Sequence, residues 1–175
     1  FGSVSLGWAF SEEQFVEFLK PVLSFGKLRL SYGSSGNDVG LGDYDYVSTV
    51  SLGTAGFGTI PANQVSSGFG GLISYDRTWE KVSQKNFGID LNFFDNRLKA
   101  TFDYFIKDNT GMLVNVTYPG VLGGKAPKTN SGHLNVKGWE FTIGWRDQIK
   151  DFSYYANFNI GDTKSLLKEM EGADS

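Results

Sequence analysis

The chain has 175 residues, of which 16 are basic and 19 acidic, and it contains no cysteine. This balance lacks the basic surface that nucleic-acid binding requires, and the missing cysteine excludes disulfides and thiolate metal sites. A composition of 23 Gly, 15 Phe, 8 Tyr and 4 Trp with four Pro favours an all-β chain. No apolar run approaches the ~18 residues of a transmembrane helix, which leaves transmembrane barrels possible.

Six segments alternate apolar and polar residues with the two-residue period of a β-strand, so each is apolar on one face only. In chain order they span residues 3–10, 27–32, 79–93, 98–108, 136–146 and 152–161. In the fourth segment, Phe102 and Tyr104 point to one face while Asp103 points to the other. A register slip of one residue would place charged side chains such as Arg29 on the apolar face, so the register is strongly specified.

One segment between the first two strands has a helical pattern. Ser11-Glu12-Glu13-Gln14 has the form of a capping box, and apolar residues follow it at helical spacing. Pro21 limits this predicted helix to two or three turns. We interpret it as a short amphipathic helix within a turn.

The connections between the predicted strands alternate in length. Residues 94–97 and 147–151 form tight turns, whereas 34–78 and 109–135 are long and rich in Gly, Ser, Asn and Thr. If the strands run up and down, all short turns lie at one end and all long loops at the other. Outer-membrane barrels show this asymmetry, with short periplasmic turns and long external loops.

Aromatic residues concentrate near both ends of the strands, as expected at the two interfaces of a membrane. Those predicted near the short turns are Trp8, Phe10, Phe93, Phe94, Trp145 and Phe152. Those predicted near the long loops are Tyr32, Trp79, Tyr104, Trp139 and Phe158.

Alternation alone does not separate a barrel wall from a soluble β-sandwich, because both bury one face of each strand. The longer predicted strands exceed the ~5–6 residues common in soluble sheets and match the ~9–11 that cross a bilayer. We therefore predict an all-β fold, a fragment of a large antiparallel up-and-down transmembrane barrel. Because the smallest such barrels have about eight strands, we expect residues 1–175 to be part of the barrel domain, without the plug and the remaining strands.

Four motifs resemble, in the same order, segments of the SusC-like (SusC/RagA) TonB-dependent outer-membrane transporters of Bacteroidetes. They are SVSLGWAFSEEQF (3–15), KLRLSYGSSGND (27–38), TWEKVSQKNFGIDLNFFDNRLKATFDYFIKDNTGMLV (78–114) and NSGHLNVKGWEFTI (130–143). Val136 departs from the family pattern, which usually has Asn before Lys-Gly.

The resemblance implies a plugged barrel of about 22 strands in the bacterial outer membrane. It implies an active importer, with a SusD-like surface lipoprotein as lid and energy from the TonB–ExbB–ExbD complex, reached through parts outside this chain. The cargo implied is an oligosaccharide or a peptide, moved without covalent chemistry, so neither an enzyme nor a cofactor is expected. Two alternatives stay open: a TonB-dependent siderophore or cobalamin receptor, and a soluble carbohydrate-binding β-sandwich.

The residues offer no catalytic or metal constellation. His133 is the only histidine and is interpreted as a surface or lumen residue, and Asp43 and Asp45 as parts of a solvated loop. Weak substrate-binding candidates are the loop aromatics, whose rings could stack on sugars, although packing within the loop or on a partner is the favoured role for any single one. They are Tyr44, Tyr46, Phe57, Phe69 and Tyr75. The assignment of faces also predicts that Ile89→Arg is costly in lipid whereas Asp90→Arg is tolerated.

Overall fold

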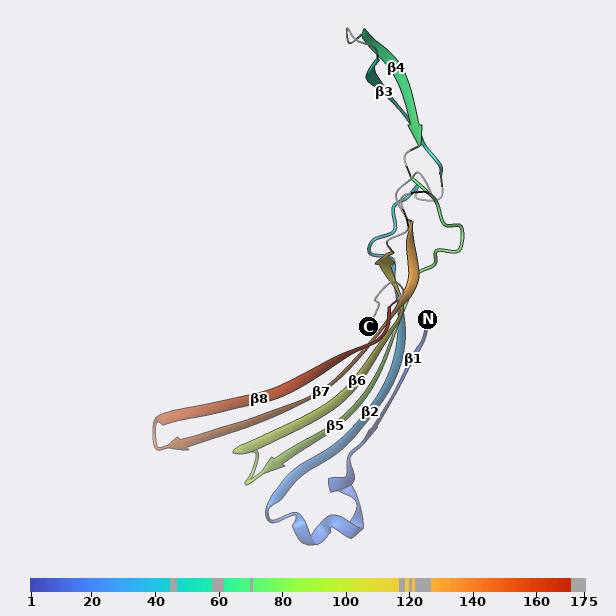
Figure 1. Ribbon diagram of the computed structural model, residues 1–175. Coiled ribbons are helices and arrows are strands. Elements are labelled where there is room, and N and C mark those ends of the chain that lie inside the picture. The colour runs from blue at the N-terminus through green and yellow to red at the C-terminus, as the bar shows by residue number, and fades with distance from the viewer. Residues whose placement is uncertain are drawn as a thin grey trace.

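The computed structural model describes residues 1–44, 47–57, 62–69, 71–116, 119, 121 and 127–170, with the backbone alone for 57, 62–64 and 69. Six long strands form one antiparallel sheet in the order β1-β2-β5-β6-β7-β8 (Figure 1). Their bounds are β1 Ser3–Trp8, β2 Leu23–Asn37, β5 Glu80–Phe93, β6 Leu98–Asn115, β7 Lys128–Ile149 and β8 Phe152–Glu169. All six predicted strands and their up-and-down order are thereby confirmed.

Several strands extend well past their predicted bounds at the long-loop end. Much of the predicted loop 109–135 is strand, because the pairing of β6 with β7 continues to Asn115 and Lys128. The β7 part of this extension is mostly polar, and in β6 the apolar residues Met112, Leu113 and Val114 follow one another, so alternation could not reveal it. The ladder of backbone hydrogen bonds persists there although apolar and polar residues do not alternate.

A second, two-stranded sheet lies inside the predicted loop 34–78. It consists of β3 (Val50–Phe57) and β4 (Ala62–Phe69), and it projects from the loop end away from the large sheet (Figure 1). Gly, Ser and Asn occupy many of its positions, which hides the strand pattern in the sequence.

The segment between β1 and β2 forms two 3-10 helices, η1 (Phe10–Glu12) and η2 (Gln14–Leu19), so the prediction of one capped α-helix is wrong. Glu13 between them has an extended backbone (φ −81°, ψ 146°), and neither helix has a side-chain cap. The Glu13 carboxylate instead accepts a hydrogen bond from Trp8 Nε1 at 3.1 Å. None of the helices among the described residues is both long and apolar enough to cross a membrane.

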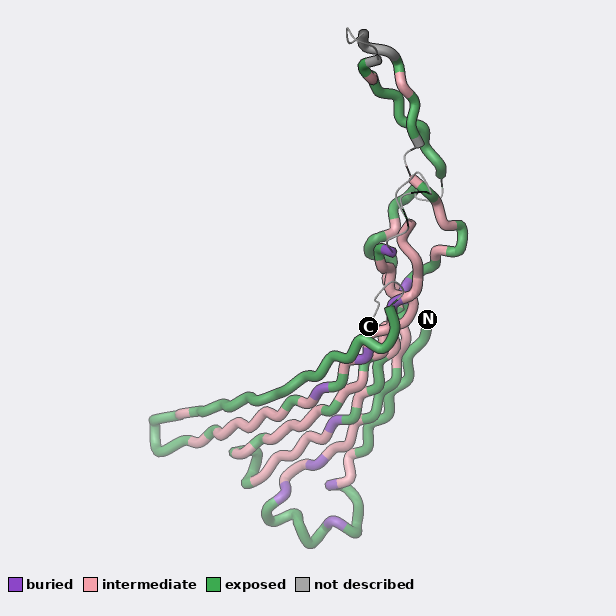
Figure 2. Tube along the Cα trace, in the orientation of Figure 1, coloured by how far each residue is buried: buried purple, intermediate pink, exposed green. Residues whose placement is uncertain are grey.

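The large sheet is a single layer. Among the described residues, Val16, Leu23 and Val116 are the only buried hydrophobic residues, and no side chain is less than 2% exposed. The inner strands are half-buried by their neighbours, while β1 and β8 at the two edges are exposed (Figure 2). No second sheet of the described residues covers either face, which the β-sandwich alternative would require. That alternative is wrong.

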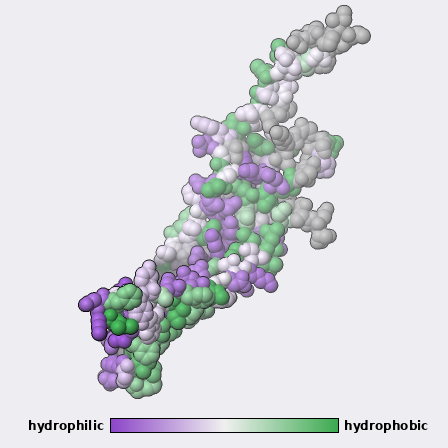
Figure 3. Space-filling model, turned by 90° about the vertical axis from the view of Figure 1, so that its left-hand side faces the viewer, coloured by the Kyte–Doolittle hydropathy of each residue, from purple (hydrophilic) through white to green (hydrophobic). Residues whose placement is uncertain are grey.

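The register aligns the apolar residues in rows that cross the sheet on one face, which we call the apolar face. The central row contains Trp8, Leu28, Ile89, Phe102, Phe141 and Ile160. The adjacent row on the loop side contains Leu6, Leu30, Phe87, Tyr104 and Trp139. Phe158 pairs with Ile143 and thus lies on the short-turn side of the central row, contrary to its predicted place near the loops. Hydrophobic residues gather in the short-turn half of the sheet and hydrophilic residues nearer the loops (Figure 3).

Candidate functional site

The opposite face of the large sheet, which we call the polar face, carries an ionic cluster at its centre. Arg29 on β2 donates to Asp90 through Nε at 2.7 Å and Nη2 at 3.0 Å, and to Asp103 Oδ2 through Nη2 at 3.1 Å. The paired contact with Asp90 has the fork geometry of a strong guanidinium–carboxylate bond. Because Asp90 holds Arg29, the structure reverses the expectation that Asp90→Arg is tolerated.

Gly88 provides the space for this cluster. The register places Arg29, Gly88 and Asp103 side by side on three neighbouring strands. A Cβ atom at Gly88 would lie 2.6 Å from Asp103 Oδ1 and 2.7 Å from Arg29 Cζ, so the guanidinium fills the place of a side chain. The same row continues to Glu140 on β7, which adds a second carboxylate beside Asp103. This packing explains the glycine in the Asn86-Phe87-Gly88-Ile89-Asp90 motif.

Phe105 is an aromatic exception on the polar face. Its ring lies over Gly138 of β7, where a Cβ atom would approach Phe105 Cζ to 2.5 Å. The glycine of the Lys137-Gly138-Trp139-Glu140 motif therefore leaves room for this ring. The polar face is thus a largely hydrophilic wall in which the Phe105 ring forms an aromatic platform.

Glu80 joins three strands at the loop end of the polar face. Its carboxylate accepts hydrogen bonds from the Leu113 amide at 2.9 Å, Asn37 Nδ2 at 3.0 Å and Asn109 Nδ2 at 3.3 Å. Burial raises the pKa of the Glu80 carboxyl, but these three hydrogen bonds outweigh it and leave the pKa below its ordinary value. Glu80 therefore fixes β2 and β6 to the start of β5 as a carboxylate.

Asn130 on β7 fastens the loop that precedes β5. Its side-chain amide accepts from the Thr78 amide and donates to the Thr78 carbonyl, both at 2.8 Å, and also donates to the Gly111 carbonyl at 2.7 Å. Gly111 has a positive φ of 67° at a register shift in β6. The asparagine thus imitates a backbone partner where the regular ladder is interrupted, a role that the sequence pattern did not indicate.

Of the five predicted loop aromatics, Tyr44 lines a cavity in the part of the chain that the structure describes. This open hollow of about 690 Å³ lies between the loops and is also lined by Leu41, Leu72, Arg77 and Lys128. The Lys128 Nζ atom donates to the Gly40 carbonyl at 3.2 Å and closes one side of the hollow. Its mixture of apolar, aromatic and cationic groups suits a polar molecule with an apolar face.

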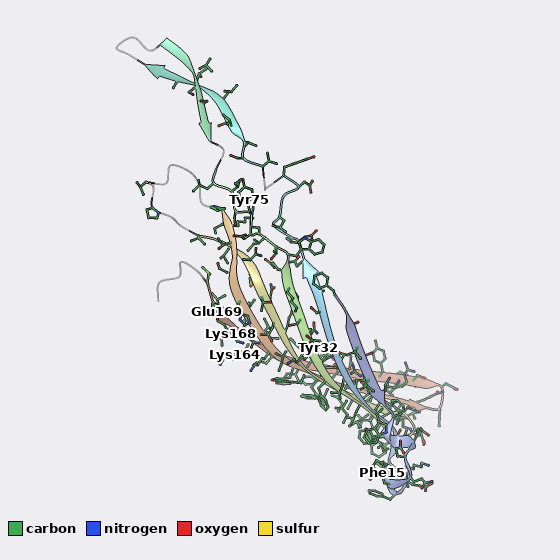
Figure 4. All side chains as sticks on the ribbon, turned by 90° about the vertical axis from the view of Figure 1, so that its right-hand side faces the viewer. Phe15, Tyr32, Tyr75, Lys164, Lys168 and Glu169 are labelled. Atoms are coloured by element: carbon green, nitrogen blue, oxygen red, sulfur yellow. The ribbon has the colours of Figure 1, made fainter. Side chains whose placement is uncertain are left out.

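The other predicted aromatics do not gather at this hollow. Tyr75 is 81% exposed and lies among the loops beyond the ends of the strands (Figure 4). Phe57 and Phe69 lie at opposite ends of the β3–β4 hairpin, where their backbones pair with Ala62 and Val50. Their side chains and all of Tyr46 lie outside the described part of the structure. The five therefore do not form one site in the part of the chain that the structure describes.

The predicted polar loop residues are also placed. His133 Nε2 lies 3.3 Å from Asp108 Oδ1 on β6, and it is half-buried. Asp43 is exposed, and Asp45 lies outside the described residues. No group of three His, Asp or Glu side chains within the described ranges is arranged to hold a metal ion.

Comparisons with known proteins agree on one family. Residues 1–172 match the sequence model of the family described as TonB dependent receptor-like, beta-barrel. TonB-dependent receptor P39 of Formosa agariphila is 29% identical over an alignment of 180 positions, which covers 99% of this chain and 16% of that protein. TonB-dependent receptor SusC of Bacteroides thetaiotaomicron is 28% identical over an alignment of 178 positions, which covers 99% of this chain and 18% of that protein.

Solved structures give the same result. The RagAB peptide transporter superposes with a TM-score of 0.79 at 27% identity, over 97% of this chain and 18% of that chain. The RagAB peptide importer in its open-open state superposes with a TM-score of 0.81 at 25% identity, over 98% of this chain and 18% of that chain. The chain thus spans less than a fifth of the length of these relatives.

Proposed function

Because this chain belongs to the TonB-dependent receptor-like β-barrel family, we propose that it forms part of the wall of an outer-membrane importer of the SusC/RagA type. The observation that carries the proposal is the superposition of 97% of the chain, strands and loops together, on the RagAB peptide transporter. In this proposal the apolar face meets lipid and the polar face lines the lumen.

The dimensions of the apolar face support its place in a bilayer. From Phe93 near the short turn to Lys85 near the loops, β5 extends by roughly 26 Å at ~3.3 Å per residue. With the strand tilt of ~40° usual in membrane barrels, this corresponds to roughly 20 Å of height, close to the ~25 Å apolar band of such barrels. Large side chains within it remain open to a surrounding medium, including Leu6, Leu30, Phe158 and Ile160, which are 70, 53, 58 and 48% exposed.

The polar face supports passage of a hydrophilic cargo. Arg29, Asp90 and Asp103 are partly exposed, and Arg29 offsets one of the two carboxylate charges. Lys27 and Lys99 on the same face add positive charge, so the wall stays wet and carries charges of both signs. We propose that an oligosaccharide or a peptide first binds at the loop end, where the hollow around Tyr44 is one contact. The TonB–ExbB–ExbD complex then moves the plug and opens the lumen, and no bond of the cargo is broken.

The β3–β4 hairpin supports a partner on the cell surface. An isolated two-stranded hairpin is marginally stable at best in water. Val50, Leu52 and Val65 share one of its faces by register and are 61, 76 and 79% exposed. We propose that this apolar hairpin face packs on a SusD-like lipoprotein that covers the loop end.

The test uses the full-length protein in its own host. A strain without the gene would receive the wild type, or a variant in which residues 50–69 are replaced by a short Gly-Ser linker. We expect the wild type to restore uptake of labelled oligosaccharides or peptides in a TonB-dependent manner and to co-purify with a surface lipoprotein. The linker variant should reach the membrane but lose the lipoprotein.

Two results would contradict the proposal. Uptake of ferric siderophores or cobalamin, with no effect on oligosaccharides and peptides, would favour the other receptor class. If the linker variant co-purified with the lipoprotein as well as the wild type does, the hairpin would not be part of the partner interface.

A further inference from the structure

A row of lysines crosses the apolar face at its loop-side border. The register aligns Tyr32, Lys85, Ile106, Lys137 and Lys164 on five neighbouring strands. We propose that this lysine row binds the phosphate groups of an anionic membrane lipid in the leaflet on the loop side. The inference rests on the proposed orientation of the wall in a membrane.

The lysines lack anionic partners within the described part of the chain. Lys85, Lys137 and Lys164 are exposed, and none of them makes an ion pair with a described carboxylate. Lys137 and Lys164 are direct cross-strand partners. Like charges in this position repel each other, so an external anion between them would relieve a cost that the fold itself leaves in place.

The position of the row selects an amphipathic ligand. On the side of the sheet centre it borders Leu30, Phe87, Tyr104 and Trp139 of the next row. Tyr and Trp favour the interface of a membrane, and lysines there extend their ammonium groups toward the head groups. A phosphate held by the lysines would leave acyl chains to lie along the apolar rows, which a soluble anion could not do.

The two borders of the apolar face differ in charge. Toward the short turns, the last row shared by β5, β6, β7 and β8 contains Phe93, Leu98, Trp145 and Ala156, with no cation. The cation just beyond it, Arg97, is paired with Asp147 at 3.4 Å. All three lysines of the apolar rows are at the opposite border. If the lysines only extended into water, unpaired cations would be expected at both borders of the apolar face. Their presence at one border favours an anionic leaflet on the loop side.

The carboxylates of this face leave the cations in excess. Beyond the row, Asp108 accepts from Asn135 Nδ2 at 2.8 Å and lies 3.8 Å from Lys168 Nζ, which adds a fourth cation. Asp162, one row nearer the centre, accepts a hydrogen bond from the Thr163 amide at 2.9 Å. Lys164, Lys168 and Glu169 follow one another along β8 toward the loop end (Figure 4).

The test measures binding of a phosphorylated lipid to the full-length protein in detergent by native mass spectrometry. The probes are lipid A, dephosphorylated lipid A and inorganic phosphate. We expect Lys85→Gln, Lys137→Gln and Lys164→Gln together to weaken lipid A binding by about tenfold or more, since each lysine near an anionic surface contributes severalfold. A matched control removes three lysines of the polar face, Lys27, Lys99 and Lys107, and should leave binding unchanged.

Equal weakening by both triple variants, or none by the first, would overturn the inference. So would wild-type affinity for dephosphorylated lipid A, or displacement of lipid A by equimolar inorganic phosphate. The uptake assay reports separately on the proposed function. A wild type that imports cargo while the first triple variant keeps its lipid would refute the lysine site alone.

Discussion

Arg29 on β2 and Asp103 on β6 form an ion pair, with Nη2 and Oδ2 3.1 Å apart, although the whole of β5 lies between their strands. The contact is possible because the intervening position in the row is Gly88. The Arg29 side chain, which also binds Asp90 on β5, thus connects the three strands β2, β5 and β6. It should therefore be sensitive to any side chain at position 88.

We predict that Gly88→Ala destabilises the barrel by about 1–3 kcal/mol, because the new methyl group displaces the guanidinium from Asp103. Urea unfolding of the full-length protein in detergent, followed by tryptophan fluorescence, measures this loss. Gly144→Ala is the matched control on the same face, since its Cβ atom would meet Asn157 Oδ1 at an ordinary 3.5 Å. Similar losses for the two variants would show that the space at Gly88 does not matter.

Adjacent residues of β8 test which face meets lipid. Ile160 lies in the central row of the apolar face, while Asn159 points to the polar face. Ile160→Arg should reduce the free energy of unfolding in lipid vesicles by about 2–4 kcal/mol, and Asn159→Arg by less than about 1 kcal/mol. The assignment fails if the two variants unfold at the same urea concentration.

The bonds to Glu80 make the loop end sensitive to acid. A carboxyl whose pKa is lower in the folded state stabilises that state fully above its ordinary pKa of about 4.3. This contribution is lost as the pH falls below that value through the lower pKa of the folded state. At pH 7 we expect Glu80→Gln to cost about 1–2 kcal/mol, since a charge-assisted acceptor is replaced.

Urea unfolding at neutral and at acid pH checks this sign. The difference between the wild type and Glu80→Gln should be largest at pH 7 and should shrink as the pH falls below about 4.3. As a control for the loss of a carboxylate, Glu12→Gln at an exposed position in η1 should leave the stability at pH 7 unchanged. A difference that grows on acidification would contradict the role assigned to Glu80.

Asn130→Ala should loosen the segment before β5, because two hydrogen bonds to Thr78 are lost at a cost of about 1–2 kcal/mol. A loss of about 1 kcal/mol makes the locally open state roughly fivefold more populated. On intact cells, trypsin should therefore cleave after Arg77 roughly fivefold faster or more. Asn92→Ala, which removes a bond to Asn96 in the short turn, serves as control. Unchanged cleavage at Arg77 would show that Asn130 does not hold this loop.

The sequence determined the six strands, their faces and their antiparallel order. Alternation of Phe102, Asp103 and Tyr104 is a local consequence of the strand geometry, and it holds whatever the neighbouring strands are. The alternation of short and long connections then indicated that the strands follow one another in a simple up-and-down order. Local pattern failed in the extensions of β6 and β7 and in the β3–β4 hairpin, where Gly, Ser and Asn or a run of apolar residues interrupt the alternation. It also failed where Glu13 bonded Trp8 instead of continuing a helix.

Only the tertiary structure decided which residues meet across strands. Arg29, Gly88 and Asp103 are far apart in the chain, as are Lys85, Lys137 and Lys164, and nothing in their local spacing brings them into rows. The rows follow from the register of the backbone hydrogen bonds between strands, which is a long-range property. The ionic cluster and the lysine row therefore became visible only once those strands were paired.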